Sequence, residues 1–251
     1  MALNKDEIFK SYESAKRIQD TILPGEKFIK QMIPDSFILY LPRDTVSGDF
    51  YWIEEVNDTI LFAVADCTGH GVPGAMLTVM CHRAVERSFK EFGMVIPGHI
   101  LDKTLEILVS DFKANEQTLT DGMDIALCAK TGNLLKFSGA NNSLWIVRNR
   151  ILFEINATKQ AIGIVNNPAP FVTEDFTLIS GDAIYLFSDG FSHQFGGERD
   201  KKYTPARLRD LLISINHVTM VGQRMILEKA FLDWKGKYDQ TDDVCIMGVR
   251  V

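Results

Sequence analysis

Hydrophobic positions follow two different periods along this chain of 251 residues. Between residues 5 and 22 they recur three, four or seven positions apart, which predicts an amphipathic helix. Pro24 and Gly25 follow and are expected to end that helix. From Phe37 onward, short apolar runs are separated by tight polar turns, a pattern that is typical of antiparallel strands.

The predicted strands and helices come in groups. Strands are expected at residues 36–41, 49–56, 59–66, 123–130, 134–140, 143–147, 151–155, 171–178, 183–189 and 244–251. Helices are expected at residues 75–92, 97–112, 205–215 and 220–234, a polar loop at 113–122 and an exposed flap at 191–205. A parallel α/β sheet would alternate strand and helix, so the order predicts an α+β fold of two facing antiparallel sheets with helical pairs outside.

No linker or internal repeat divides the chain after residue 25. We therefore expect an N-terminal linker helix within residues 1–25 and a single domain over residues 26–251. Two interpretations of the helix stay open at this point. It packs on its own domain, or it is a coupling helix that pairs with a second copy or relays a signal from an upstream module.

Composition and charge argue against several classes of partner and site. The net charge is −6 and no basic stripe occurs, which argues against a nucleic-acid partner. The first ten residues are polar and no apolar run approaches the length of a membrane span, so we expect no membrane association. The four cysteines are scattered without a CxxC pair, which argues against a zinc site or a disulfide framework and favours a reducing, cytoplasmic location.

Aspartates stand at the ends of several apolar strands. Asp49, Asp66 and Asp189 each adjoin an apolar strand and a glycine-containing turn, and Asp242–Asp243 precede the last strand. A two-residue turn joins strands 49–56 and 59–66, so Asp49 and Asp66 are expected to face each other across a hairpin.

Any one of these aspartates is explained as a turn former, but the set is not. Carboxylates that gather repel one another unless a cation neutralises them. Hard oxygen ligands without cysteine or clustered histidine select Mg²⁺ or Mn²⁺. Two such ions roughly 3.5–4 Å apart bind a phosphoryl group and acidify a bridging water.

Five segments carry these residues in order: GDFYW, ADCTGHGVPGAML, SGANN, LFSDGF and QTDDV. With this order and spacing, residues 15–251 resemble the bacterial SpoIIE/RsbU-type serine phosphatases, a branch of the metal-dependent PP2C-like (PPM) family. The resemblance implies a PP2C-like four-layer α/β/β/α sandwich. It also implies hydrolysis of phosphoserine or phosphothreonine on a signalling protein, by a water that bridges two Mn²⁺ or Mg²⁺ ions and without a phosphoenzyme.

The resemblance also implies roles for single residues. Asp66 would bridge both metals, and Asp49 would support one of them, directly or through water. The backbone carbonyl of Cys67 would be a further ligand, and Asp189 would bind the second metal. Of the last pair, Asp242 aligns with the family ligand and Asp243 is the alternative.

Three other positions have two interpretations each. His70 is either a general acid that protonates the departing serine oxygen or a turn residue. Arg43 is either a phosphate-binding arginine or a surface residue beside Pro42. Asn141 and Asn142 stand where relatives read Asn-Ala-Gly-His; the histidine is absent here, so we expect a structural hydrogen-bonding role.

The main hypothesis is a protein serine/threonine phosphatase, and the main rival is a regulatory or binding module of the same fold with little activity. A hydrolase of small phosphoesters is a third possibility. The expected partner is a phosphorylated protein, for which the resemblance suggests a STAS-type anti-sigma-factor antagonist. An upstream sensor module and a homodimer through the N-terminal helix are further expectations.

Overall fold

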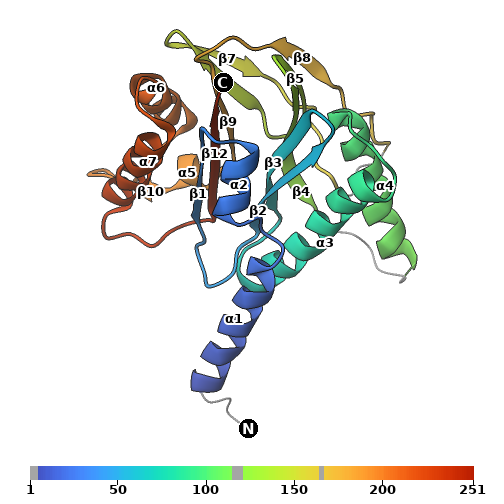
Figure 1. Cartoon of the computed structure of the whole chain (residues 1–251). Helices are drawn as coiled ribbons and strands as arrows, with labels where there is room; N and C mark the ends of the chain where they lie inside the picture. The colour runs from blue at the N-terminus through green and yellow to red at the C-terminus, as the bar shows by residue number, and fades with distance from the viewer. Residues whose placement is uncertain (1–4, 115–120, 164–166) are drawn as a thin grey trace.

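The computed structural model describes residues 5–114, 121–163 and 167–251 and contains two five-stranded antiparallel sheets that lie face to face (Figure 1). One sheet has the order β2 (Asp49–Val56), β3 (Thr59–Cys67), β4 (Met123–Thr131), β5 (Leu134–Ala140) and β8 (Glu174–Thr177). The other has the order β1 (Ser36–Leu41), β12 (Val244–Arg250), β9 (Ala183–Phe187), β6 (Leu144–Arg148) and β7 (Ile151–Ile155).

A pair of helices covers the outer face of each sheet (Figure 1). The β2–β8 sheet is covered by α3 (Gly71–Lys90) and α4 (Pro97–Ala114). The β1–β7 sheet is covered by α6 (Pro205–Ile215) and α7 (Met220–Lys235). The predicted α+β fold, a four-layer α/β/β/α sandwich, is therefore confirmed.

Strand β3 is apolar along most of its length because both of its faces are buried. Its alternate side chains face two different layers. Leu61, Ala63 and Ala65 pack with α3 and α4, whereas Phe62 and Val64 pack between the sheets against residues of β9 and β12. All five are fully buried, so β3 has no polar face and forms the centre of its sheet.

Some boundaries differ from the sequence prediction. Helix α2 (Glu26–Met32) was not predicted, because its seven residues are too few to establish a period. Helix α3 begins at Gly71, four residues early, because Pro73 occupies a first-turn position where no N–H partner is needed. The loop predicted at 113–122 is wrong for residues 113–114, which belong to α4; its residues 115–120 lie outside the described part of the chain.

The exposed flap predicted at 191–205 is only partly correct. A one-turn helix α5 (Gly190–His193) and a hairpin of β10 (Phe195–Gly196) and β11 (Lys201–Lys202) occupy it. Phe191 and Gln194 are fully buried, while residues 198–202 are exposed. The segment is polar in composition, yet it is anchored by these two side chains, which a composition argument overlooks.

Helix α1 (Lys5–Asp20) extends away from the sandwich (Figure 1). Gln19 is its one buried residue, whereas Ile8, Phe9 and Ile18 are exposed. No helix in the described ranges is both long and apolar enough to cross a bilayer.

Candidate active site

Three neighbouring strands each place an aspartate at the same end of one sheet. Asp49 at the start of β2 pairs in register with Asp66 near the end of β3, and Asp66 pairs with Asp124 at the start of β4. The predicted convergence of Asp49 and Asp66 across a hairpin is confirmed. Asp66 is the central carboxylate of the three because β3 lies between the other two strands.

The facing sheet brings two more acidic positions to this end. Strands β9 and β12 are antiparallel neighbours, so the end of β9 lies beside the start of β12. Asp189 follows β9, and Asp242 and Asp243 precede β12. A Cβ atom on Gly190 would collide with the carbonyl oxygen of Asp243, so only glycine lets the two loops approach this closely.

Burial and mutual repulsion raise the pKa values of the carboxylates in this cluster. Burial raises the pKa of Asp66 to about 8, with further contributions from the charges of Asp189, Asp242 and Asp124. Burial, followed by the charge of Asp66, also raises the pKa of Asp49 well above its usual range. A divalent cation among these groups would reverse both effects, because it favours the ionised carboxylates.

The donor set fits a hard divalent cation. The Oδ1 atom of Asp189 is buried and has no hydrogen-bond partner in the described residues. The carbonyl oxygen of Cys67, a predicted ligand, lies beside Gly48 and hence next to Asp49. Across the described ranges, no three Asp, Glu, His or Cys side chains lie close enough together to hold a metal ion by themselves.

Hydrogen bonds from the facing sheet fix the position of Asp49. Its side chain is 1% exposed, and its Oδ2 accepts a 2.5 Å hydrogen bond from the Ser188 hydroxyl. Ser188 in turn accepts from the backbone N–H of Cys245 at 2.9 Å. The hydroxyl of Tyr40 donates to the backbone carbonyl of Asp49 at 3.1 Å. These bonds connect Asp49, on one sheet, to β9, β12 and β1 of the other.

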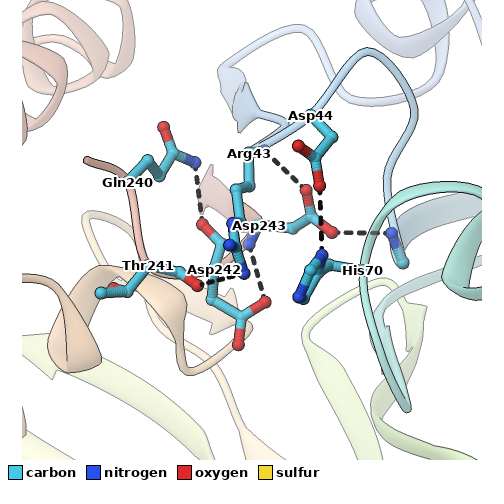
Figure 2. A network of polar contacts seen from close by, with 8 residues as sticks. Arg43, Asp44, His70, Gln240, Thr241, Asp242 and Asp243 are labelled. Carbon is cyan, nitrogen blue, oxygen red and sulfur yellow. Dashed lines mark hydrogen bonds and ion pairs between the residues drawn. The ribbon is translucent and has the colours of Figure 1, made fainter.

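The adjacent aspartates Asp242 and Asp243 have different surroundings (Figure 2). Asp243 is 2% exposed, and its two carboxylate oxygens accept the backbone N–H groups of Arg43 and Gly48, each at 2.7 Å. Asp242 is partly exposed; among the described residues its carboxylate accepts the N–H of Asp243, at 2.9 Å, and its backbone carbonyl accepts Nε2 of Gln240, at 2.8 Å. Both carboxylate oxygens of Asp243 therefore bind the loop before β2, whereas Oδ2 of Asp242 has no hydrogen-bond partner in the described residues.

Arg43 lies beside Asp242 and Asp243, and His70 lies beside Asp44 (Figure 2). The exposed Arg43 guanidinium donates to the carbonyl of Thr241 at 3.1 Å, directly before Asp242. His70 precedes α3, and its Nδ1 lies 3.1 Å from Oδ2 of Asp44, so the described contact is not with a predicted metal ligand. Both side chains are exposed enough to meet a substrate.

Asp124 was missed by sequence reasoning, although it opens an apolar strand directly after Gly122–Met123 as the others do. Its Oδ1 accepts a 2.8 Å hydrogen bond from Nδ2 of Asn141, which adopts a left-handed backbone with φ of 57°. The structural role predicted for Asn141 is confirmed. The Nδ2 of Asn142 is buried without a partner in the described residues, so the same role is not found there.

A buried polar network connects α1 and α3 to the loop before Asp49. The side-chain amide of Gln19 donates to the carbonyl of Ser47 at 2.6 Å and accepts its N–H at 2.9 Å. The Thr78 hydroxyl of α3 donates to the carbonyl of Gly48 at 2.6 Å. The Ser47 hydroxyl accepts the N–H of Asp49 at 3.0 Å. Gln19 is therefore two hydrogen bonds away from Asp49.

Comparison with known proteins establishes the class. The family model for stage II sporulation protein E (SpoIIE) matches residues 57–251, which is most of the chain. The chain therefore belongs to the SpoIIE family and is a SpoIIE/RsbU-type, PP2C-like phosphatase domain.

Individual relatives agree with this assignment. The chain is 28% identical over 193 residues to the phosphoserine phosphatase RsbU of Bacillus subtilis; the match covers 74% of this chain and 54% of RsbU, so the chain spans about half the length of this curated relative. The structure of the SiaA-PP2C domain of Pseudomonas aeruginosa matches with a TM-score of 0.91, 31% identity and complete coverage of both chains. The phosphatase and partial regulatory domains of Bacillus subtilis SpoIIE match with a TM-score of 0.69 at 16% identity, over 86% of this chain and 63% of that one, which shows a shared fold.

Proposed function

We propose that this protein is a metal-dependent protein serine/threonine phosphatase that hydrolyses phosphoserine or phosphothreonine on a signalling protein. The observation that carries the proposal is the convergence of Asp49, Asp66, Asp189 and Asp242 from two sheets onto one end of the sandwich. Membership of the SpoIIE family and the similarity to a phosphoserine phosphatase support it.

Two Mn²⁺ or Mg²⁺ ions, when bound, would supply an acidified water as nucleophile and polarise the phosphoryl oxygens. The chain contributes the ligands. Asp66, central in its sheet, is suited to bridge both ions, with Asp49 and the carbonyl of Cys67 on one side and Asp189 and Asp242 on the other. Of the last pair we assign Asp242, because both oxygens of Asp243 are committed to backbone N–H groups.

Arg43 and His70 are assigned to the substrate side of the site. Four of the five N–H donors of Arg43 have no partner in the described residues, so the guanidinium can hold phosphoryl oxygens while it stays anchored to Thr241. His70 is oriented by Asp44, and its Nε2 edge is the one available to a leaving serine oxygen.

The rival function is a regulatory or binding module with little activity. A phosphate-release assay on a phosphoserine-containing protein distinguishes the two. We expect Mn²⁺-dependent release by the wild type, none with a chelator, and none with Asp66→Ala. Absence of release by the folded wild type with either ion would support the rival. Equal preference for p-nitrophenyl phosphate and the phosphoprotein would instead favour a small-ester hydrolase.

We further propose that α1, within residues 1–25, couples the domain over residues 26–251 to an upstream module or a second copy. The bidentate contact of Gln19 with Ser47 supports this, since it places the helix next to the Asp49 loop. A phosphorylated STAS-type anti-sigma-factor antagonist is the proposed substrate. The four buried free thiols are in keeping with the cytoplasmic location that we propose. Deleting residues 1–20 should change oligomeric mass by light scattering or basal rate.

A further inference from the structure

His193 contacts one carboxylate oxygen of Asp189, and the other oxygen has no hydrogen-bond partner in the described residues. It is the last residue of α5, and its Nδ1 lies 3.0 Å from Oδ2 of Asp189, four residues earlier. The Oδ1 atom of the same carboxylate is buried and has no hydrogen-bond partner in the described residues. Burial raises the pKa of Asp189, and the neighbouring His193 lowers it. When the carboxylate is ionised, as a metal ligand must be, it can only accept, so Nδ1–H is then the donor and Oδ2 the acceptor.

The backbone that carries both residues is rigid. The N–H of His193 and the hydroxyl of Ser192 both donate to the carbonyl of Asp189, at 3.0 and 2.9 Å. Phe191 lies between Asp189 and His193 in the sequence and is fully buried. Its ring centroid lies 5.0 Å from that of Tyr203 and 5.2 Å from that of Phe231. The relative placement of the imidazole and the carboxylate therefore follows from a packed turn.

The neighbouring loop fixes the same turn from the other side. Gly190 lies against the backbone carbonyl of Asp243, so α5 cannot shift without moving the residues before β12. Gln194, directly after His193, is fully buried, and its side chain accepts the N–H of Thr241 at 3.0 Å and donates to the carbonyl of Asp239 at 2.9 Å. His193 thus stands between two anchored residues at the edge of the carboxylate cluster.

We propose that His193 is a positioning residue: its Nδ1–H holds Oδ2 of Asp189 and so presents Oδ1 to a divalent cation. This inference rests on the proposed function and extends it. A hydrogen bond to one oxygen restricts rotation of the carboxylate about its last torsion, which is broad for aspartate. A carboxylate whose orientation is already fixed loses less conformational entropy when the cation binds. Groups that orient metal ligands in this way typically contribute about 10–100-fold to metal affinity.

The expected effect lies at the lower end of that range. The His193 and Asp189 side chains are 42% and 47% exposed, so water can partly replace the imidazole after its removal. We expect loss of the imidazole to weaken Mn²⁺ binding about tenfold at one of the two sites. The other site, which Asp49 and Asp66 form without contact to His193, keeps its affinity.

The test measures binding of Mn²⁺ alone to the full chain, by the electron paramagnetic resonance signal of free Mn²⁺. His193→Ala should weaken one class of sites about tenfold, whereas His193→Asn, whose Nδ2 takes the place of Nδ1, should restore binding to within about threefold of wild type. His193→Gln carries its amide one bond further out and should behave like alanine. His217→Ala, at an exposed histidine between α6 and α7, is the matched control.

Activity on p-nitrophenyl phosphate provides a second readout. The Mn²⁺ concentration for half-maximal rate should rise with His193→Ala by the same factor as the dissociation constant, and saturating Mn²⁺ should recover the lost rate. Equal Mn²⁺ affinity of wild type and His193→Ala, or failure of asparagine to rescue, overturns the role of His193. A wild type that neither binds Mn²⁺ nor hydrolyses the ester overturns the proposed function instead.

Discussion

The adjacent residues Asp242 and Asp243 should respond to truncation in opposite ways. Asp243→Ala removes both acceptors of two backbone N–H groups, those of Arg43 and Gly48, at a position that is 2% exposed. Asp242→Ala removes a carboxylate whose one described hydrogen bond is to its own neighbour. We therefore expect Asp243→Ala to reduce stability and Asp242→Ala to reduce activity.

The magnitude follows from the two bonds. A hydrogen bond to a charged group contributes about 1.5–3 kcal/mol, so two give about 3–6 kcal/mol. Burial offsets part of this, since it raises the pKa of Asp243 despite the two N–H donors. A net loss of about 3 kcal/mol lowers the melting temperature of a domain of this size by roughly 6–12 °C. For Asp242→Ala we expect less than about 1 kcal/mol.

Thermal melting without metal and Mn²⁺-dependent phosphate release at a temperature well below both transitions measure the two effects. Asp242→Ala should melt near the wild type and lose about 100-fold or more in rate, since a metal ligand is worth several kcal/mol in the transition state. Asp243→Asn should also melt early, because its amide N–H₂ meets a backbone N–H. Asp243 is not a structural residue if Asp243→Ala melts with the wild type, and the two roles are reversed if folded Asp243→Ala is inactive while Asp242→Ala is active.

Three other changes test separate parts of the structure. Asp182→Asn should lower the melting temperature at pH 7 by roughly 5–10 °C, because the 1% exposed carboxylate accepts Nε and Nη2 of Arg148 at 2.8 and 2.6 Å. Burial alone would raise the pKa of Asp182, but the hydrogen bonds from Arg148 and from the N–H of Ile179 outweigh burial, so the pKa is lowered overall. The stabilisation is therefore present above about pH 4 and disappears as the pH falls through the lowered pKa. A difference in melting temperature between wild type and Asp182→Asn that stays constant down to pH 2 would contradict this. Gln19→Leu leaves the buried N–H of Ser47 without a partner and should reduce the free energy of unfolding in urea by about 1–3 kcal/mol; an unchanged midpoint would mean that α1 is not locked to the loop. Mn²⁺ at about 100 times its dissociation constant should stabilise the wild type by about 2.7 kcal/mol, seen as a higher melting temperature that Asp66→Asn largely abolishes.

Much of the fold could be predicted because its elements are long and periodic. The hairpin that joins β2 and β3 follows from two apolar runs and the turn Asn57–Asp58, and it alone places Asp49 opposite Asp66. The pairing of β1 with β12, more than 200 residues apart in the chain, cannot be read from either strand, because any apolar strand satisfies the same pattern. Short elements such as α2 fall below the length at which periodicity is informative.

The site was predicted in part for the same reason. Aspartates that end long apolar strands are visible in the sequence, whereas the roles of Asp242 and Asp243 depend on backbone N–H groups about 200 residues away. Asp124 could have been found as the register partner of Asp66 once β3 and β4 were paired. His193 has no sequence signal, since its meaning comes from a one-turn helix inside a polar segment.

We propose that Asp66 bridges two divalent cations and that both sheets supply the other ligands. The most direct measurement is a crystal structure with Mn²⁺, with the ions located by anomalous scattering. We expect two peaks roughly 3.5–4 Å apart, both bound by Asp66, with Asp189 and Asp242 on one of them and Asp243 still bonded to its backbone N–H groups. A single ion held by Asp243, or no ion within bonding distance of Asp66 at saturating Mn²⁺, would contradict it.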